Sequence, residues 1–247
     1  MTHTADITRP PQHLIDKIRD MGTATASSTL FHASHIRNSH IVGPFAWTKG
    51  RRNAGPALTL QFMPKREDLY DDDEYADVEK QLHRHVLYHT RPGDIVGVDA
   101  RADMASGVFG EMMLTYFRGR GGQGVVVDGC LRDIVNIEKI DLGLWIRGVT
   151  PNFHTQTGLM PFAVNVPIAC GGCTVMPGDI IVADDDGAVV VPAGLAEHLI
   201  EQAHIRHEWE DFVRIKLAEG GDLRRYYPLS DEARPEYEAW LKDQSKG

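Results

Sequence analysis

Cysteine is scarce in this chain. Only Cys130, Cys170 and Cys173 occur among its 247 residues, too few for a disulfide framework, so we expect reduced thiols. Cys170 and Cys173 have the spacing of half a zinc site, but no second Cys-x-x-Cys follows them. Two small residues that flank a glycine turn between strands explain this pair better than a metal or redox site does.

Long apolar runs and an excess of positive charge are also missing. No run approaches the roughly 20 apolar residues of a membrane-spanning helix, and the polar amino terminus contains no apolar signal segment. The net charge of −9 and the pI of about 5.7 provide no long-range attraction to phosphate backbones or anionic membranes. We expect a cytoplasmic protein that binds neither nucleic acid nor membranes.

The length of the chain and its hydrophobic content of 42% are sufficient for one sizeable core. We predict a single domain over residues 1–247. Its core is expected at about 14–220, followed by a charged carboxyl-terminal extension at about 221–247. No internal repeat or low-complexity segment is evident.

Apolar residues recur at helical spacing in some segments and at strand spacing in others. The helical pattern predicts helices at 10–21, 25–36, 77–89, 134–140 and 195–219. β-Branched or alternating segments predict strands at 57–62, 95–98, 125–127 and 144–147, with several more between 162 and 191. Strands interleaved with helices and followed by strand-rich sequence imply an α/β sandwich with a mixed sheet.

Two groups of histidines lie on or near these predicted helices. In the first group no carboxylate or cysteine stands at a suitable spacing, so solvated or core histidines are favoured over a metal site: His32, His35 and His40. The second group lies mostly on the outer face of the helix predicted at 77–89: His83, His85 and His89.

The charged run at 65–75 has no periodicity and is predicted to be a solvated loop. Its aspartates, Asp71 to Asp73, could attract calcium. They lack the alternate spacing and the glycine of a calcium-binding loop, so a calcium site is not favoured.

Residues 124–133, with the sequence GVVVDGCLRD, form the central segment of the chain. The three valines predict a short buried strand, which the turn dipeptide Asp128-Gly129 is expected to stop. Such a strand delivers Arg132 and Asp133 to its carboxyl end, where ligands bind in open α/β sheets. A guanidinium beside a carboxylate there indicates anion capture next to a metal. A plain Arg-Asp turn pair at the start of the next helix is an equal alternative.

Upstream of this strand, a loop enters a predicted helix at Gly110, Glu111, Met112 and Met113. The backbone N–H groups of a first helical turn have no partner within the helix and can receive a carboxylate. Glu111 would stand alongside such a ligand.

The Gly-Glu and Arg-Asp motifs occur together with four further segments: AGPALTLQF at 54–62, PGDIVGVD at 92–99, RGVTPNF at 147–153 and NVPIACGGCTVMPGDIIVADDDGAVVVP at 165–192. From about residue 14 to 220 the chain thereby resembles one family. It is that of the class II 4-hydroxy-4-methyl-2-oxoglutarate/4-carboxy-4-hydroxy-2-oxoadipate aldolases, which are grouped with the regulator of ribonuclease E activity A.

The resemblance implies a phosphohistidine-domain-like α/β/α sandwich that forms homotrimers or homohexamers with active sites at subunit interfaces. It further implies a Mg²⁺ or Mn²⁺ ion bound directly by Asp133 and, through water, by Glu111 and Glu210. Glu210 would come from the last helix of the adjacent subunit; Asp211 and Glu208 are its nearest competitors for that role.

One position departs from the family pattern. The family has an acidic residue three positions after the metal-binding aspartate, whereas this chain has Asn136. The departure bears on metal affinity or substrate preference.

The activity implied by the resemblance is metal-dependent cleavage of a 4-hydroxy-2-oxo acid to pyruvate and a carbonyl compound. Arg132 would stabilise the enolate, and the amides of Met112 and Met113 next to Gly110 would hold the pyruvyl carboxylate. No lysine in the matching segments is placed to form a Schiff base, which favours the metal route. Oxaloacetate decarboxylation passes through the same enolate and is expected as a side activity.

The sequence favours two other functions less than the aldolase. A non-enzymatic regulator of the ribonuclease E type would keep the Arg-Asp strand but lose the carboxylate after the upstream glycine, and here Glu111 is present. A methyltransferase is not favoured, because the glycines at 119–124 precede their strand instead of following it. The sequence does not identify the distal half of the substrate. Arg147, Asn152 and His154 are candidates to contact it. Arg147 could equally form a structural ion pair.

Overall fold

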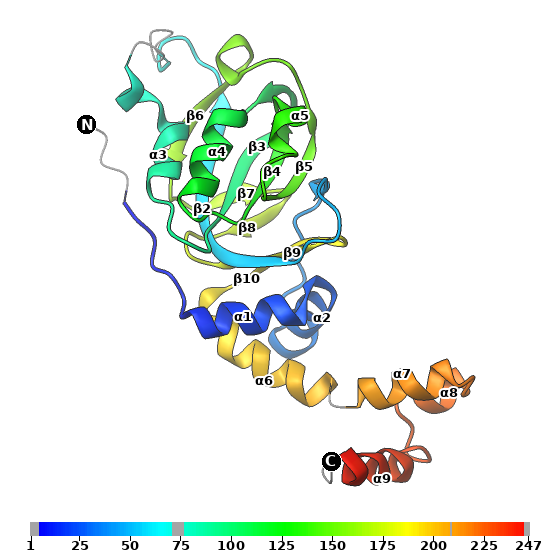
Figure 1. The fold of residues 1–247 in the computed structure, drawn as a ribbon. Helices are drawn as coiled ribbons and strands as arrows, with labels where there is room; N and C mark the ends of the chain where they lie inside the picture. The colour runs from blue at the N-terminus through cyan, green and yellow to red at the C-terminus, as the bar shows by residue number, and fades with distance from the viewer. Residues whose placement is uncertain (1–4, 71–76, 208, 245–247) are drawn as a thin grey trace. The chain divides into compact units, whose positions relative to one another are not determined.

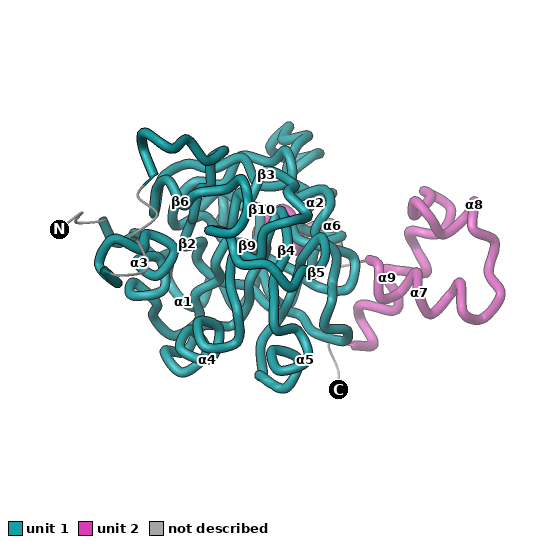
Figure 2. Tube along the Cα trace, turned by 90° about the horizontal axis from the view of Figure 1, so that it is seen from above, with its two compact units in different colours: residues 1–200 teal, residues 201–247 magenta. Residues whose placement is uncertain are grey.

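The computed structural model describes residues 5–70, 77–207 and 209–244. The chain divides into two compact units, residues 1–200 and residues 201–247 (Figure 2). The division falls inside helix α6 (Ala196–His207), earlier in the chain than the extension expected from about residue 221.

A mixed sheet of eight strands lies at the centre of the first unit's described part (Figure 1). The strands run in the order β1-β5-β4-β3-β2-β9-β10, and β6 pairs with β2. Neighbours within β2–β5 are parallel and all other pairs are antiparallel, which confirms the predicted mixed sheet. The bounds are β1 (Phe45–Ala46), β2 (Asn53–Pro64), β3 (Ile95–Gly107), β4 (Gly124–Leu131), β5 (Gly143–Val149), β6 (Leu159–Val164), β9 (Ile180–Asp184) and β10 (Gly187–Val191).

Helices cover two sides of these strands. On one face of the parallel strands lie α3 (Leu82–Tyr88), α4 (Glu111–Gly119) and α5 (Ile134–Ile137), as Figure 1 shows. Helices α1 (Gln12–Met21) and α2 (Thr23–Ser34) pack against β9 and β10. The hairpin of β7 (Ile168–Cys170) and β8 (Cys173–Val175) packs on the other face of the parallel strands. Short 3₁₀ turns are η2 (Val78–Lys80), η3 (His154–Gln156) and η4 (Ala193–Leu195).

The second unit contains helices α7 (Glu210–Ala218), α8 (Leu223–Tyr226) and α9 (Arg234–Gln244). Phe212, Val213, Tyr226 and Tyr237 form the greater part of its small buried cluster. No helix in the described part of either unit is long and apolar enough to cross a membrane.

Several sequence predictions are confirmed. The helix predicted at 10–21 is α1, and Gly22 ends it with a φ of 78°. His32, His35 and His40 are exposed, as expected for solvated side chains. Cys170 and Cys173 face each other across a two-glycine turn, and both thiols are buried and free. The aspartates Asp71 to Asp73 and Glu208 lie outside the described residues.

Three other predictions are wrong. Strand β4 continues through Asp128-Gly129 to Leu131, because the buried Asp128 carboxylate pairs with the Arg147 guanidinium. The helix predicted at 195–219 is divided between η4, α6 and α7. His83 and His85 are buried instead of facing outward, because the short helix α3 packs against β6, β2 and α4 on more than one side.

A pair of glycine substitutions tests how tightly α4 is packed. A Cβ at Gly122 would overlap the ring of the buried Phe117, so Gly122→Ala should destabilise the protein by about 1–3 kcal/mol. Gly119, the last residue of α4, has nothing within 4 Å of its Cβ position, so Gly119→Ala should be neutral or slightly stabilising. Urea unfolding of both variants measures the difference. Equal stabilities would contradict the packing described for this helix.

Candidate functional site

A cleft of about 240 Å³ lies where β4 ends and α4 begins. Five residues singled out from the sequence line it together: Gly110, Met112, Met113, Arg132 and Asp133. Both sequence motifs therefore meet at the carboxyl edge of the parallel strands, the expected location of a ligand site in an α/β sheet.

The turn after β4 orients the Arg-Asp pair. Asp133 has a left-handed backbone (φ 61°, ψ 31°) that aspartate tolerates better than most residues, and it starts the short helix α5. The Arg132 N–H donates to the Phe109 carbonyl at 3.1 Å, which fixes the strand end against the loop before α4. The Arg132 Nε lies 3.6 Å from Asp133 Oδ2, with side-chain exposures of 37% and 43%. Because both side chains are partly exposed, both are accessible to a ligand. An ion pair this long and this exposed stabilises the fold little.

Gly110 allows α4 to approach this pair closely. A Cβ at Gly110 would lie 2.5 Å from Asp133 Oδ2 and 3.0 Å from Arg132 Nε. The Glu111 N–H, at the start of α4, donates to Asp133 Oδ2 at 3.4 Å. The amides of Met112 and Met113 follow in the first turn, where a helix provides no carbonyl partner. The cleft therefore combines a helix amino terminus, a guanidinium and a carboxylate.

Asn136 holds the Glu111 side chain. Its Nδ2 donates to Glu111 Oε2 at 2.9 Å, and its Oδ1 accepts from Lys139 Nζ at 3.2 Å. A lysine can only donate, so Lys139 fixes the amide with its nitrogen toward Glu111. An acidic residue at 136 would instead bring a second negative charge against Glu111. The departure from the family pattern thus has a structural role in this chain.

The cleft is also lined by residues that no sequence motif marked as ligand-binding. His83 and Arg84 come from α3, and Phe153 precedes η3. The Arg132 guanidinium lies over the Phe153 ring at 5.4 Å. No sequence spacing relates α3 to the end of β4, because only tertiary packing brings them together.

His154, a candidate from the sequence, also lines the cleft and is 1% exposed. Its ring meets the His83 ring edge-on at 4.4 Å between centroids. Burial lowers the pKa of His154 to about 2, and the electrostatic effects of His83, Arg132 and Lys65 act in the same direction. The His154 imidazole is therefore neutral at ordinary pH.

The remaining candidates lie elsewhere. Arg147 forms an ion pair with Asp128 and donates to the Val42 carbonyl at 3.0 Å, which confirms the structural alternative for this residue. Asn152 contributes its carbonyl to the Gly107 N–H at 3.0 Å. Glu210 begins α7 in the second unit.

The donor set of the cleft fits a hydrated hard cation better than zinc. Among the described residues, no three His, Cys, Asp or Glu side chains gather in a way that could hold a metal ion. A structural or catalytic zinc site requires three or four such ligands. Mg²⁺ and Mn²⁺ commonly keep several waters and bind one or two carboxylates, and the half-exposed Asp133 carboxylate suits this mode.

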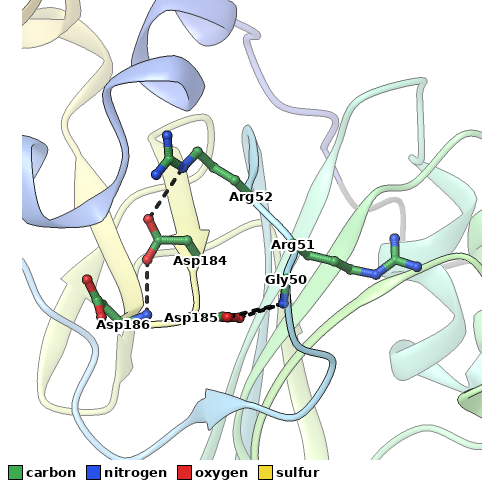
Figure 3. Close-up of a pocket in the computed structure, with 6 residues that line it drawn as sticks. All are labelled: Gly50, Arg51, Arg52, Asp184, Asp185 and Asp186. Carbon is green, nitrogen blue, oxygen red and sulfur yellow. Dashed lines mark hydrogen bonds and ion pairs between the residues drawn. The ribbon is translucent and has the colours of Figure 1, made fainter.

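A larger cavity of about 440 Å³ lies between the segment before β2 and the turn of the β9–β10 hairpin (Figure 3). Asp184 accepts from the Thr23 backbone and hydroxyl, and Asp185 accepts from the Gly50 N–H at 2.9 Å. Figure 3 shows Arg51 pointing away from these aspartates, and its guanidinium pairs with Asp141 at 2.7 Å. These contacts fasten the hairpin turn, so the acidic ADDDG segment has a structural role.

Comparison with known proteins identifies the family. The sequence model of the RraA-like family, described as Aldolase/RraA, matches residues 14–190. The chain belongs to this family. The resemblance seen in the sequence motifs is thereby confirmed.

Relatives in the family have different names. A Halalkalibacterium halodurans protein named "Putative 4-hydroxy-4-methyl-2-oxoglutarate aldolase" is 37% identical over 117 residues, 47% of this chain and 55% of that protein. The chain spans about half the length of the curated relatives it matches.

Among solved structures, Streptomyces coelicolor RraAS2, described as an unusual member of the RNase ES inhibitor RraA protein family, is 39% identical with a TM-score of 0.77. The match covers 84% of this chain and 98% of that one. A Geobacillus kaustophilus structure described as S-adenosylmethionine: 2-dimethylmenaquinone methyltransferase is 25% identical, with a TM-score of 0.50. It covers 62% of this chain and 86% of that one.

The neutral state of His154 makes a pH-dependent prediction. The unfolded histidine takes up a proton near pH 6.5, whereas the folded one does not until about pH 2. Acidification below pH 6.5 therefore favours the unfolded state by about 1.4 kcal/mol per pH unit from this group. His154→Gln should remove that part of the slope when unfolding free energies are compared at pH 6.5, 5.5 and 4.5. An unchanged slope would show that His154 is protonated in the folded protein.

Proposed function

We propose that the cleft cleaves a 4-hydroxy-2-oxo acid to pyruvate and a carbonyl compound with the help of a divalent Mg²⁺ or Mn²⁺ ion. The observation that supports this most is the meeting of Arg132 and Asp133 with the first turn of α4 in one small cleft. Membership of a family that includes aldolases agrees with it.

The protein groups in the cleft match the charges that develop in this reaction. The amides of Met112 and Met113, in the first turn of α4, bind the pyruvyl carboxylate. When the C3–C4 bond breaks, its electron pair forms the C2–C3 double bond and negative charge moves to the C2 oxygen. The C4 hydroxyl gives its proton to water and becomes the carbonyl of the second product, and C3 of the enolate then takes a proton from water to give pyruvate. Arg132, supported by the Phe153 ring, donates to the C2 oxygen as negative charge develops there.

The metal would be held by Asp133 directly and, through water, by Glu111 and by Glu210 of a neighbouring subunit. When bound, it supplies Lewis-acid stabilisation of the charge that develops on the substrate. The hydrogen bond from Asn136 keeps the Glu111 carboxylate in one orientation. The same enolate arises when oxaloacetate loses carbon dioxide, so we include oxaloacetate decarboxylation in the proposed activity.

The alternative is a protein-binding regulator. The similarity to Streptomyces coelicolor RraAS2 over 84% of the chain favours it. The two functions differ in one measurable respect, which is pyruvate release. If the protein binds Mn²⁺ but releases no pyruvate from branched, dicarboxylic or sugar-derived 4-hydroxy-2-oxo acids, the regulator is correct.

We also propose an assembly of phosphohistidine-domain-like α/β/α sandwiches into homotrimers or homohexamers. In this assembly Glu210 completes the site of a neighbouring subunit. Support comes from family membership and from the position of Glu210 at the partly exposed start of α7.

Substitutions of the Arg-Asp pair separate the two roles. Arg132→Lys keeps the charge but loses the planar two-pronged donor, so it should retain Mn²⁺ binding and lose about a hundredfold in rate. Asp133→Asn keeps a residue that tolerates the left-handed backbone and removes only the charge, so it should lose Mn²⁺ binding and turnover together. Calorimetric Mn²⁺ titration and oxaloacetate decarboxylation measure both effects. A wild-type rate in Arg132→Lys, or unchanged Mn²⁺ binding in Asp133→Asn, would make the pair structural.

Mixing inactive subunits tests the shared site. Asp133→Asn and Glu210→Gln proteins should each be inactive, but coexpressed at equal amounts they should regain activity at about a quarter of the sites by random pairing. Light scattering should give a mass above the monomer. A monomeric mass with full activity, or no regain on coexpression, would rule out the contribution of Glu210 to a neighbour.

A further inference from the structure

The Arg132 side chain is flanked by two glycines and one aromatic ring. A Cβ at Gly107 would lie 3.0 Å from Arg132 Cβ, and a Cβ at Gly110 would lie 3.0 Å from Arg132 Nε. The Arg132 guanidinium lies over the Phe153 ring, with its carbon 5.4 Å from the ring centroid. The stem of the arginine therefore lies against two backbone segments, and its charged head lies against the ring.

The orientation of this guanidinium depends on the ring. In the described part of the chain its N–H groups donate no hydrogen bond, and its Nε lies 3.6 Å from Asp133 Oδ2. That ion pair is too long and too exposed to hold a long side chain in one geometry. The face of an aromatic ring attracts a guanidinium and leaves its N–H donors unused. Phe153 therefore restricts the guanidinium while its five donors stay available to a ligand.

The position of Phe153 is fixed by contacts of its own backbone. The Phe153 N–H donates to Gln156 Oε1 at 3.1 Å, and the Gln156 N–H donates to the Phe153 carbonyl at 3.0 Å. An isolated β-bridge joins Phe153 to Gly107, the last residue of β3. The residue that supports Arg132 is therefore held at the end of the sheet in the absence of a ligand.

We propose that Phe153 is a positioning residue, which holds the Arg132 guanidinium in the orientation that meets the enolate oxygen. This inference rests on the proposed function. Negative charge develops on the C2 oxygen only as the C3–C4 bond breaks, so a donor held in place acts more strongly on the enolate than on the bound substrate. Loss of the ring should therefore lower the rate more than it lowers substrate affinity.

The first test removes the ring. Phe153→Leu should lower kcat for oxaloacetate decarboxylation about five- to thirtyfold, the effect of one partly exposed cation–π contact, and change KM less than about twofold. Phe153→Tyr keeps an aromatic face and should retain most of the rate. Phe31→Leu is the matched control: it removes a cation–π contact of similar length, 5.3 Å from Arg37, and should change neither constant. A Phe153→Tyr rate as low as that of Phe153→Leu would overturn the proposal.

A binding measurement separates positioning from a general loss of structure. Oxalate resembles the planar enolate of pyruvate, whereas pyruvate itself represents the ground state. In calorimetry on the Mn²⁺-loaded protein, Phe153→Leu should weaken oxalate binding about five- to thirtyfold and pyruvate binding less than about twofold. Equal losses for both ligands, or no loss for either, would contradict the role of Phe153.

A double-mutant cycle tests whether the ring acts through Arg132. Lysine has no plane for the ring to orient, so in the Arg132→Lys protein the Phe153→Leu substitution should cost less than about twofold in rate. If the two losses multiply in the double variant, the ring acts on another group and the proposal is wrong.

Failure of the proposed function is recognised separately, by exchange of the pyruvate C3 hydrogens with deuterium in the Mn²⁺-loaded wild-type protein. If the wild-type protein does not exchange, the aldolase proposal fails and the role of Phe153 fails with it. If it exchanges while Phe153→Leu keeps the wild-type rate and oxalate affinity, only the role of Phe153 fails.

Discussion

The close approach of Gly110 to the Asp133 carboxylate is the contact on which the site depends. Any side chain at 110 would occupy the space of Asp133 Oδ2, so α4 could not begin where it does. The left-handed turn at Asp133 meets this requirement from the other side, because it directs the carboxylate back toward the Glu111 amide. Helix α4, strand β4 and helix α5 therefore share one junction. Movement of any of them would separate the Arg-Asp pair from the first helical turn.

The charge of the cleft is limited by the residues that contact its side chains. Asn136 occupies a position where an acid would repel Glu111, and Lys139 fixes its amide orientation. Burial lowers the pKa of His154, so its imidazole is neutral beside the two guanidiniums that line the cleft.

Sequence patterns predicted the sheet type, the helix α1 and the segments that meet at the cleft, because periodicity and turn residues are local signals. They did not predict the features that depend on contacts between residues far apart in the sequence. Asp128-Gly129 has the sequence of a turn, but Arg147 neutralises the aspartate, and Ala100 lies so close to Gly129 that only glycine fits inside the strand. His83 and Arg84 have the charge pattern of a solvated helix face. Their place in the cleft follows from the packing of α3 on α4 and β6, which no spacing encodes.

One continuous part of the sequence forms the cleft, because its described lining residues lie between His83 and His154. The parallel ladders β2–β3, β3–β4 and β4–β5 join strands that are neighbours in sequence, with α3, α4 and α5 between or after them. During synthesis these elements leave the ribosome before β6 to β10, so the binding surface can assemble first. The later strands β6, β9 and β10 then join the same sheet, and the β7–β8 hairpin covers its other face.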